Sequence, residues 1–336
     1  MTDIAKAFAA GMGRFWRDEF GVDAAISGVS AASTGARRAN VIFDLDEGSG
    51  PRRLVATIMP AGQLALNPIE IEANVRRLVR SHGVAVPEVI AVSGDSGYVG
   101  GPFFVSAFVA GESIPRRVLR LAESSGNGPQ IVRSIGLSLA RLHSIDPALA
   151  PEGVLGSGPR DPGRDAVREA ALAIEAMQPV RPALVWALEW LRANRPAPPE
   201  RLTMVHTDVR NGNVLVSQDG LQAILDWEGL RRFGDPMQDL AWTAVRAWRF
   251  RNDSLEIGGL ADRSALIDGY VEGGGTFDAE RFHWWKVSMT LWWALGMHGQ
   301  AMAHIDGTFS HIVMAASGRR VPEMEWDLLM LTKPTT

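Results

Sequence analysis

The chain of 336 residues contains no cysteine. A disulfide framework, a zinc–thiolate site and a thiol nucleophile are therefore excluded. An excess of positive charge is missing as well, because 34 basic and 38 acidic residues leave a formal net charge of −4. Without a basic surface the chain lacks the electrostatic footprint of a nucleic-acid-binding protein, and we expect no nucleic-acid partner.

Long apolar runs and several common catalytic motifs are absent too. No segment approaches the roughly 18 consecutive apolar residues that a membrane span requires. Residues 1–20 mix charged and apolar side chains, which is typical of a short amphipathic helix and not of a signal peptide. We therefore expect no membrane association and a cytoplasmic location. There is no Walker A loop, nucleophile elbow or His-Glu-x-x-His motif, and Gly94-Asp-Ser-Gly97 is interpreted as a hairpin turn.

The order of predicted elements indicates an α+β protein. Strands dominate the first hundred residues, interrupted by one helix that we expect to begin at Asn67 as N-cap. Helices dominate after Gly111. We predict an N-terminal lobe, residues 1–107, that contains an antiparallel sheet, and a larger, mainly helical C-terminal lobe, residues 108–336. The predicted strands of the first lobe are 39–45, 53–59, 89–92 and 103–109.

The strongest chemical signal lies in residues 206–239. Asp208 precedes Asn213 by five positions, and Asp226 follows after 13 more, with short apolar runs between them. A hydroxyl that attacks a phosphate needs a carboxylate to orient it and to accept its proton, and Asp208 is the candidate. Asn213 and Asp226 supply the hard oxygen ligands that Mg²⁺ prefers. The pattern predicts phosphoryl transfer from a nucleotide to a hydroxyl, in which the protein mainly positions groups and balances charge.

Each of these residues also has a plainer interpretation. Asp and Asn often cap turns between short strands, but the three together, flanked by apolar strands, favour catalysis. His206 is predicted to be a structural hydrogen-bonder, because no second histidine lies at metal-ligand spacing. Asp239 precedes a predicted helix, so it can cap that helix or tether a loop as readily as it can take part in catalysis.

Three motifs resemble those of the aminoglycoside phosphotransferase/choline kinase-like family, which has a protein-kinase-like fold. They are His206-x-Asp208-x4-Asn213, Asp226-Trp-Glu228 and Gly234-Asp-Pro-x2-Asp239-Leu-Ala. The resemblance implies Mg²⁺, ATP or GTP as the phosphoryl donor, and a small-molecule hydroxyl as the acceptor. It leaves the oligomeric state open.

The resemblance also implies nucleotide-binding residues in the N-terminal lobe. Ser30 and Ser33 lie in a stretch that is similar to the family's phosphate-covering loop and offer hydroxyls to phosphate. Glu72 resembles the family's helix-C glutamate. Phe108 lies in the stretch that resembles the hinge between the lobes. We expect these four residues to line the nucleotide site.

Thr57 departs from the family pattern, because members usually carry Lys or Arg at this position of the third strand. A hydroxyl can hydrogen-bond to a phosphate but cannot neutralise its charge. Losing one charge-stabilising donor costs on the order of 3 kcal/mol, or about 10²-fold in rate. Either Arg37, Arg38 or Arg53 replaces the missing base in an active enzyme, or the chain is a catalytically impaired pseudokinase that serves as a ligand-binding or interaction module. The complete Asp–Asn–Asp set favours the enzyme.

The acceptor is expected to bind among the helices that follow Asp239. Residues 241–310 contain 8 acids and 6 bases, a net charge of −2, so a strongly cationic aminoglycoside finds no clearly acidic pocket there. Six tryptophans lie in the same stretch. Core packing is the simpler interpretation of them, and an aromatic-walled pocket for a sugar or an apolar alcohol is the alternative. The six are Trp242, Trp248, Trp284, Trp285, Trp292 and Trp293.

Overall fold

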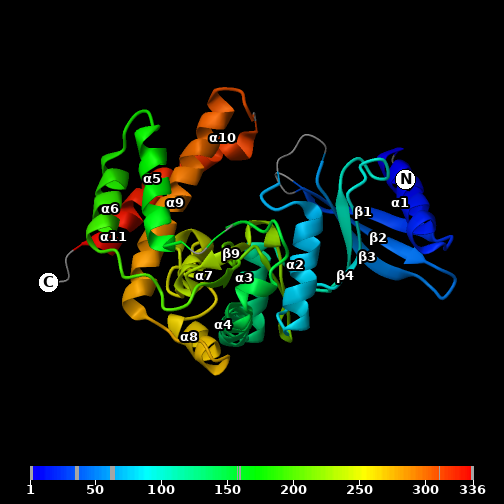
Figure 1. The fold of residues 1–336 in the computed structure, drawn as a ribbon, viewed down its shortest axis with the longest axis horizontal. Coiled ribbons are helices and arrows are strands. Elements are labelled where there is room, and N and C mark those ends of the chain that lie inside the picture. Colours follow the sequence, from blue (N-terminus) through cyan, green and yellow to red (C-terminus); the bar gives the residue numbers. More distant parts are fainter. Residues whose placement is uncertain are drawn as a thin grey trace.

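A five-stranded antiparallel sheet forms the centre of the N-terminal lobe in this computed structural model, with strand order β1-β2-β3-β5-β4 (Figure 1). The structure describes residues 3–34, 38–60, 65–156, 158, 160–309 and 311–333, and the side chains of residues 32–34 lie outside this description. The predicted strands are all present, whereas β1 was not predicted. The five strands are β1 (Ala25–Thr34), β2 (Ala39–Asp46), β3 (Arg52–Ile58), β4 (Val89–Ser93) and β5 (Phe103–Ala107).

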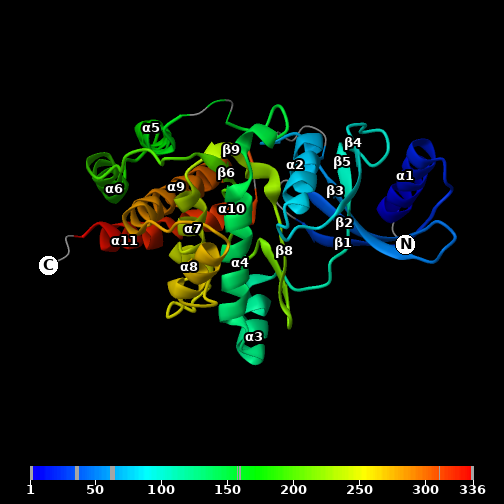
Figure 2. The ribbon, with the colours of Figure 1, turned by 60° about the horizontal axis from the view of Figure 1, so that its bottom comes forward.

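One helix packs on each face of this sheet, because successive side chains of a strand point to opposite faces. Helix α1 (Asp3–Phe20) covers one face, where its Phe15 ring lies 4.9 Å from that of Phe103. Helix α2 (Ile69–Ser81) covers the other face and packs against the next residue of β5, Phe104. Figure 2 shows the two helices on either side of the strands, with α2 facing the C-terminal lobe.

The start of α2 differs from the prediction. The helix begins at Ile69 with Pro68 before it, and no side chain caps its first turn. Asn67 is instead buried and connects the two lobes. Its amide donates to the carbonyl oxygens of Glu228 and Leu230, both at 2.9 Å, and its own oxygen accepts the backbone N–H of Leu155 at 3.0 Å. The N-cap prediction for Asn67 is therefore wrong, because more distant backbone groups compete successfully for its side chain.

The C-terminal lobe is mainly helical, and its largest apolar core surrounds α4 and the 27-residue helix α9. Two short strand pairs, β6 with β9 and β7 with β8, lie beside α4 and face the N-terminal lobe. None of the described helices has the length and apolarity needed to cross a membrane. The helices are α3 (Pro115–Ser125), α4 (Gly128–Ser144), α5 (Pro162–Glu175), α6 (Pro182–Ala193), α7 (Pro236–Thr243), α8 (Arg263–Glu272), α9 (Ala279–Ile305), α10 (Ile312–Gly318) and α11 (Val321–Thr332). The strands are β6 (Thr203–Val205), β7 (Val214–Ser217), β8 (Gly220–Ile224) and β9 (Arg231–Gly234), and the short 3-10 turns are η1 (Pro147–Leu149), η2 (Trp227–Gly229) and η3 (Arg246–Arg249).

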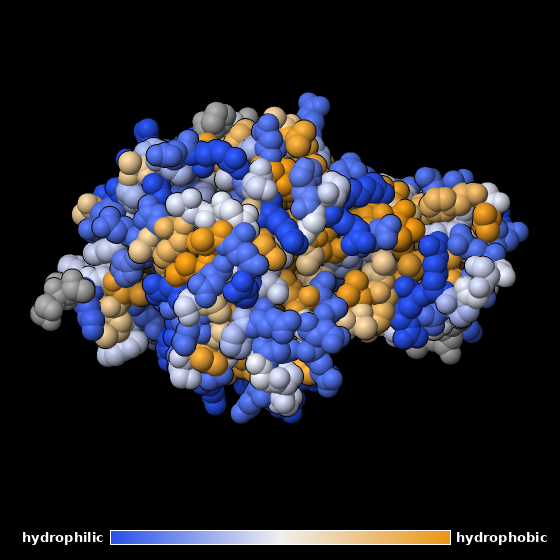
Figure 3. All heavy atoms as spheres, turned by 90° about the horizontal axis from the view of Figure 1, so that it is seen from below, coloured by the Kyte–Doolittle hydropathy of each residue, from blue (hydrophilic) through white to orange (hydrophobic). Residues whose placement is uncertain are grey.

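The lobes meet along α2 and the segment that follows it. The backbone N–H of Ile224, at the end of β8, donates to the carbonyl of Ala85 at 2.7 Å, and α2 contacts the η2 turn. Figure 3 shows hydrophobic residues around the junction, interspersed with hydrophilic ones. The packing therefore brings α2 next to the segment that carries Asp226.

Candidate active site

The loop between β6 and β7 carries the predicted catalytic motif, and Asp239 holds its first turn. Both Asp239 carboxylate oxygens accept loop N–H groups, from His206 at 2.8 Å and from Thr207 at 2.7 Å, and His143 contacts the same carboxylate at 3.0 Å. Thr207 has a φ of 73°, a conformation that favours glycine. Its hydroxyl donates to the carbonyl of Gly229 at 3.0 Å, which further stabilises this conformation. Of the roles considered for Asp239, the geometry is that of a loop tether.

His206 is buried and makes structural hydrogen bonds. Its Nδ1 accepts the backbone N–H of Asp208 at 3.2 Å, so its Nε2 carries the proton and donates to the carbonyl of Leu225 at 3.1 Å. Burial lowers the pKa of His206, which favours the neutral ring. The imidazole also lies edge-on to Trp227, with ring centroids 4.4 Å apart. This arrangement agrees with a structural role and uses both ring nitrogens.

Asp208 and Asn213 are in direct contact. The Asn213 amide nitrogen donates to Asp208 Oδ2 at 2.6 Å and to the Asp208 carbonyl at 3.0 Å. Asp208 Oδ1 accepts two further hydrogen bonds, from Trp242 Nε1 at 2.8 Å and from Arg210 Nε at 3.0 Å. Burial raises the pKa of Asp208, and the neighbouring Asp226 raises it further against the opposing effect of Arg210. The carboxylate is thus held in one orientation and made more basic than an exposed aspartate.

Asp226 lies beside this pair because β7 and β8 form a hairpin. The backbone N–H of Leu225 donates to the carbonyl of Asn213 at 2.8 Å, which places Asp226 next to the motif loop. Asp226 has φ 61° and ψ 66°, a strained conformation for a residue with a side chain. The structure therefore brings the three predicted residues, Asp208, Asn213 and Asp226, together at the junction of the lobes.

The donor set at this position fits a hard divalent cation. The Asn213 nitrogen is used for Asp208, which leaves its carbonyl oxygen for a metal, and Asp226 supplies a carboxylate. Within the described ranges, no three His, Asp or Glu side chains gather closely enough to bind a metal by themselves. A bound Mg²⁺ would therefore complete its coordination shell with phosphate oxygens and water, as this ion commonly does in nucleotide sites.

Arg38, which directly precedes β2, pairs with Glu72, the acid expected to contact the strand-three base. Thr57 on β3 is buried, and its hydroxyl donates to Asn40 Oδ1 at 2.9 Å. Glu72 on α2 pairs with Arg38, whose Nη1 lies 2.5 Å from Glu72 Oε2 and whose Nε lies 2.9 Å from Glu228 Oε2. Arg53 is half exposed and pairs with Asp44 on the neighbouring strand. Arg37 lies outside the described residues.

The other predicted nucleotide-binding residues are more dispersed. Ser30 lies within β1 opposite Ile42, so the stretch expected to be a loop is an irregular strand at this position. The side chain of Ser33 lies outside the described part of the chain. Phe108 directly follows β5 and is 37% exposed, with the Arg53 guanidinium 5.7 Å from its ring. Phe108 is thus a partly exposed aromatic residue at the link between the lobes.

The tryptophans divide into two groups. Trp284 and Trp285 are buried in the core, as the simpler interpretation predicts, and so are Trp242 and Trp248. The four tryptophans other than Trp284 and Trp285 form a cluster next to Asp208, with centroid distances of 4.8 Å for Trp242–Trp248, 5.4 Å for Trp242–Trp292 and 4.9 Å for Trp248–Trp293. In this cluster, Trp292 is 49% exposed.

Trp242 and Arg210 are site residues that sequence reasoning did not assign. Arg210 bonds to Asp208, and its guanidinium lies 4.6 Å from the Trp248 ring. Arg210 lies between Asp208 and Asn213 in the sequence, and this position was the signal that could have identified it as a site residue. Trp242 follows Asp239 by three positions, and nothing in that spacing indicates that its indole reaches Asp208.

A sheet lobe, a helical lobe and an Asp–Asn–Asp site at their junction define a protein-kinase-like phosphotransferase fold. A model of the family described as "Phosphotransferase enzyme family" matches residues 29–285. The chain belongs to this family, as the sequence motifs predicted.

Solved structures share this fold. A protein of Ralstonia eutropha, named as a candidate aminoglycoside phosphotransferase, aligns with a TM-score of 0.70 and 19% identity over 96% of this chain and 97% of its own. A thermostable mutant of aminoglycoside phosphotransferase APH(4)-Ia, in ternary complex with AMP-PNP and hygromycin B, aligns with a TM-score of 0.64 and 17% identity over 97% of this chain and 100% of its own. At these sequence identities, the structural similarity shows that the two proteins share the fold of this chain.

Acyl-CoA dehydrogenase family member 10 of Mus musculus is 29% identical over 202 residues. The match covers 58% of this chain and 18% of that protein, so the chain corresponds to a small part of the relative.

Proposed function

We propose that this protein transfers a phosphoryl group from ATP or GTP to a hydroxyl of a small molecule, with Asp208 as the catalytic base and Asn213 and Asp226 as ligands of Mg²⁺. The observation that supports this most is the 2.6 Å contact of Asp208 with Asn213 beside the strained Asp226. The complex of the structurally similar APH(4)-Ia with AMP-PNP supports a nucleotide donor. We place the boundary between the lobes at residues 107 and 108, where β5 ends.

In this proposal the chain's own residues orient the acceptor and receive its proton. Asp208 accepts a hydrogen bond from the acceptor hydroxyl and then its proton as the oxygen attacks phosphorus. The raised pKa of Asp208 makes it a better proton acceptor than an exposed aspartate. Trp242 fixes the rotamer of the carboxylate from one side. Bound Mg²⁺ supplies the positive charge that offsets the charge of the phosphates.

The tryptophan cluster next to Asp208 supports an acceptor with an apolar face. Aromatic side chains bind the apolar faces of sugars and hydrocarbon groups, and Trp292 is half exposed at the edge of the cluster. The Arg210 guanidinium lies 4.6 Å from the ring of Trp248 in this cluster, and its positive charge would repel a polycation. We therefore propose a sugar or an apolar alcohol as the acceptor. Tight binding and phosphorylation of a cationic aminoglycoside would contradict this proposal.

Mg²⁺-dependent production of nucleoside diphosphate tests the function. Wild type and Asp208→Asn are compared across a panel of sugars, apolar alcohols and aminoglycosides, with Asp219→Asn in the exposed β7–β8 turn as the matched control. Loss of the base is expected to reduce turnover about 10²- to 10⁴-fold, whereas the control retains wild-type turnover. Equal and near-zero turnover of wild type and Asp208→Asn on every acceptor would favour the alternative, a pseudokinase that binds ligands without transferring phosphate.

A further inference from the structure

Two buried guanidinium groups lie next to the candidate metal site and carry unused hydrogen-bond donors. Arg76 on α2 is 6% exposed and stacks on Phe104, with its guanidinium 4.8 Å from the ring. The Arg38 side chain is 9% exposed. Arg76 Nε and Arg38 Nη2 make no hydrogen bond with any residue that the structure describes. A buried charged donor without an acceptor is costly, which suggests that a ligand supplies the acceptor.

The surrounding charges indicate where that ligand lies. Arg76 follows Glu72 by one helical turn on the same face of α2. Arg38 bridges Glu72 and Glu228, which is two residues from Asp226. Burial lowers the pKa of Arg76, while Glu72 and Asp226 oppose this effect, so both acids act on its charge. Arg38 therefore lies between helix α2 and the segment that carries the candidate metal ligand, and Arg76 projects from α2 within electrostatic range of Asp226.

We propose that Arg38 and Arg76 together bind the phosphates of the nucleotide and replace the basic residue that Thr57 does not supply. The proposal rests on the proposed phosphotransfer function and names the groups that hold its donor. Arg38 keeps its contact with Glu72, as a strand base would, and directs its remaining donor at a phosphate oxygen. Arg76 contributes its Nε–H and a second positive charge from helix α2.

The other basic candidates fit this role less well. Arg53 is about half exposed, and its ion pair is with Asp44 on the neighbouring strand and not with Glu72. Thr57 uses its hydroxyl for Asn40. A purely structural role for Arg76 would account for its contact with Phe104, but it leaves the desolvated Nε–H without an acceptor.

Binding of ATP and of adenosine to the full chain, measured by calorimetry in the presence of Mg²⁺, separates a phosphate-binding role from a structural one. Arg76→Met and Arg38→Met are each expected to weaken ATP binding about 10- to 100-fold, the range for losing a hydrogen bond to a charged group. Both should leave adenosine binding within about 2-fold of wild type, because adenosine has no phosphate. Arg77→Met, at the exposed neighbouring position of α2, is the matched control and should bind both ligands as wild type does.

The proposal is overturned if the Met variants bind ATP as tightly as wild type, or lose ATP and adenosine affinity equally. If Arg76→Met does not fold, Arg76→Lys keeps the charge but changes the donor geometry, and it should lose several-fold affinity for ATP and none for adenosine. Unchanged affinity of Arg76→Lys for both ligands would then exclude Arg76 from the phosphate site.

The two proposals fail in different ways. A wild-type protein that binds no nucleotide contradicts the phosphotransferase function itself. A wild-type protein that binds ATP, loses turnover on Asp208→Asn and shows unchanged ATP affinity in the Arg38 and Arg76 variants contradicts only the assignment of the two arginines.

Discussion

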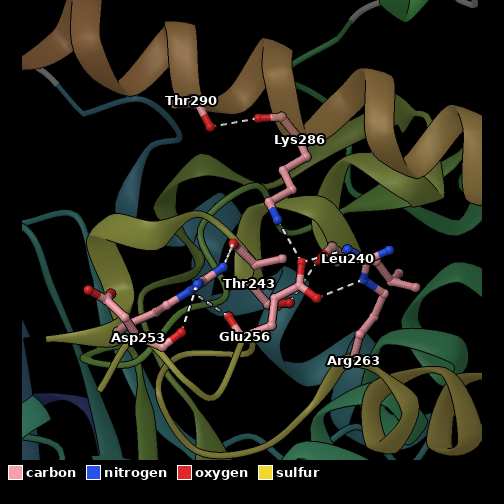
Figure 4. Close-up of polar contacts among 9 residues, drawn as sticks. Leu240, Thr243, Asp253, Glu256, Arg263, Lys286 and Thr290 are labelled. Carbon is pink, nitrogen blue, oxygen red and sulfur yellow. Dashed lines mark hydrogen bonds and ion pairs between the residues drawn. The ribbon is translucent and has the colours of Figure 1, made fainter. Parts of the chain in front are cut away.

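Glu256 is the acid at the centre of a partly buried ionic network that links its segment to α9, and its removal gives a quantitative test of the C-terminal lobe. Its Oε1 accepts from Lys286 Nζ at 2.6 Å and from Arg263 at 2.7 Å, while its Oε2 accepts from Arg263 at 2.9 Å (Figure 4). Burial alone raises the pKa of Glu256, but Arg263 and Lys286 outweigh it and bring the pKa to about 2 from an ordinary 4.5.

The size of the effect follows from that pKa difference. A difference of about 2.5 units, at about 1.4 kcal/mol per unit, corresponds to about 3 kcal/mol of stability at neutral pH. Because the folded-state pKa of Glu256 is depressed, this contribution is fully present above pH 4.5 and is lost as the pH falls through about 2. Glu256→Gln should therefore destabilise the protein by about 3 kcal/mol at pH 7, and by progressively less as the pH falls below about 4.5.

Urea unfolding followed by tryptophan fluorescence at pH 7, 5, 4 and 3 measures this dependence. Glu152→Gln is the matched control, because Glu152 is exposed in a loop, and its effect should stay within about 0.5 kcal/mol at every pH. A cost below 1 kcal/mol at pH 7 for Glu256→Gln, or the same cost at pH 7 and pH 3, would refute the reasoning. The first result would mean that the ion pairs only offset their own desolvation.

Two further predictions concern the candidate site. Trp242→Phe removes the hydrogen bond to Asp208 Oδ1 that lowers the carboxyl pKa, so the acid limb of the kcat/KM profile should move to higher pH and kcat should fall about 10-fold; an unchanged acid limb would show that this bond does not act on the base. Trp292→Ala, at the half-exposed edge of the cluster, should raise the KM of the acceptor about 10-fold without changing the KM of ATP or the melting temperature, and a wild-type KM for every accepted alcohol would exclude Trp292 from the acceptor site.

The sequence alone predicted the α+β class, the kinase-like motifs and the meeting of Asp208, Asn213 and Asp226. These features were accessible because the motif lies on one loop and one hairpin, where short-range spacing largely determines geometry. Apolar runs bounded by turn-forming residues likewise predicted most strands, because such runs are a local property of the chain.

Only the tertiary structure decided which distant side chains complete the site. Arg38 and Glu72 are 34 residues apart, and Trp242 and Asp208 are also 34 apart, so no local pattern indicates that either pair is in contact. Asn67 shows the same limit, because its predicted helix cap lost to backbone partners about 160 residues away. Such contacts depend on how elements distant in the chain pack, within one lobe for the first two pairs and between the lobes for Asn67. A buried polar group needs a hydrogen-bond partner, and that partner can lie at any distance along the chain.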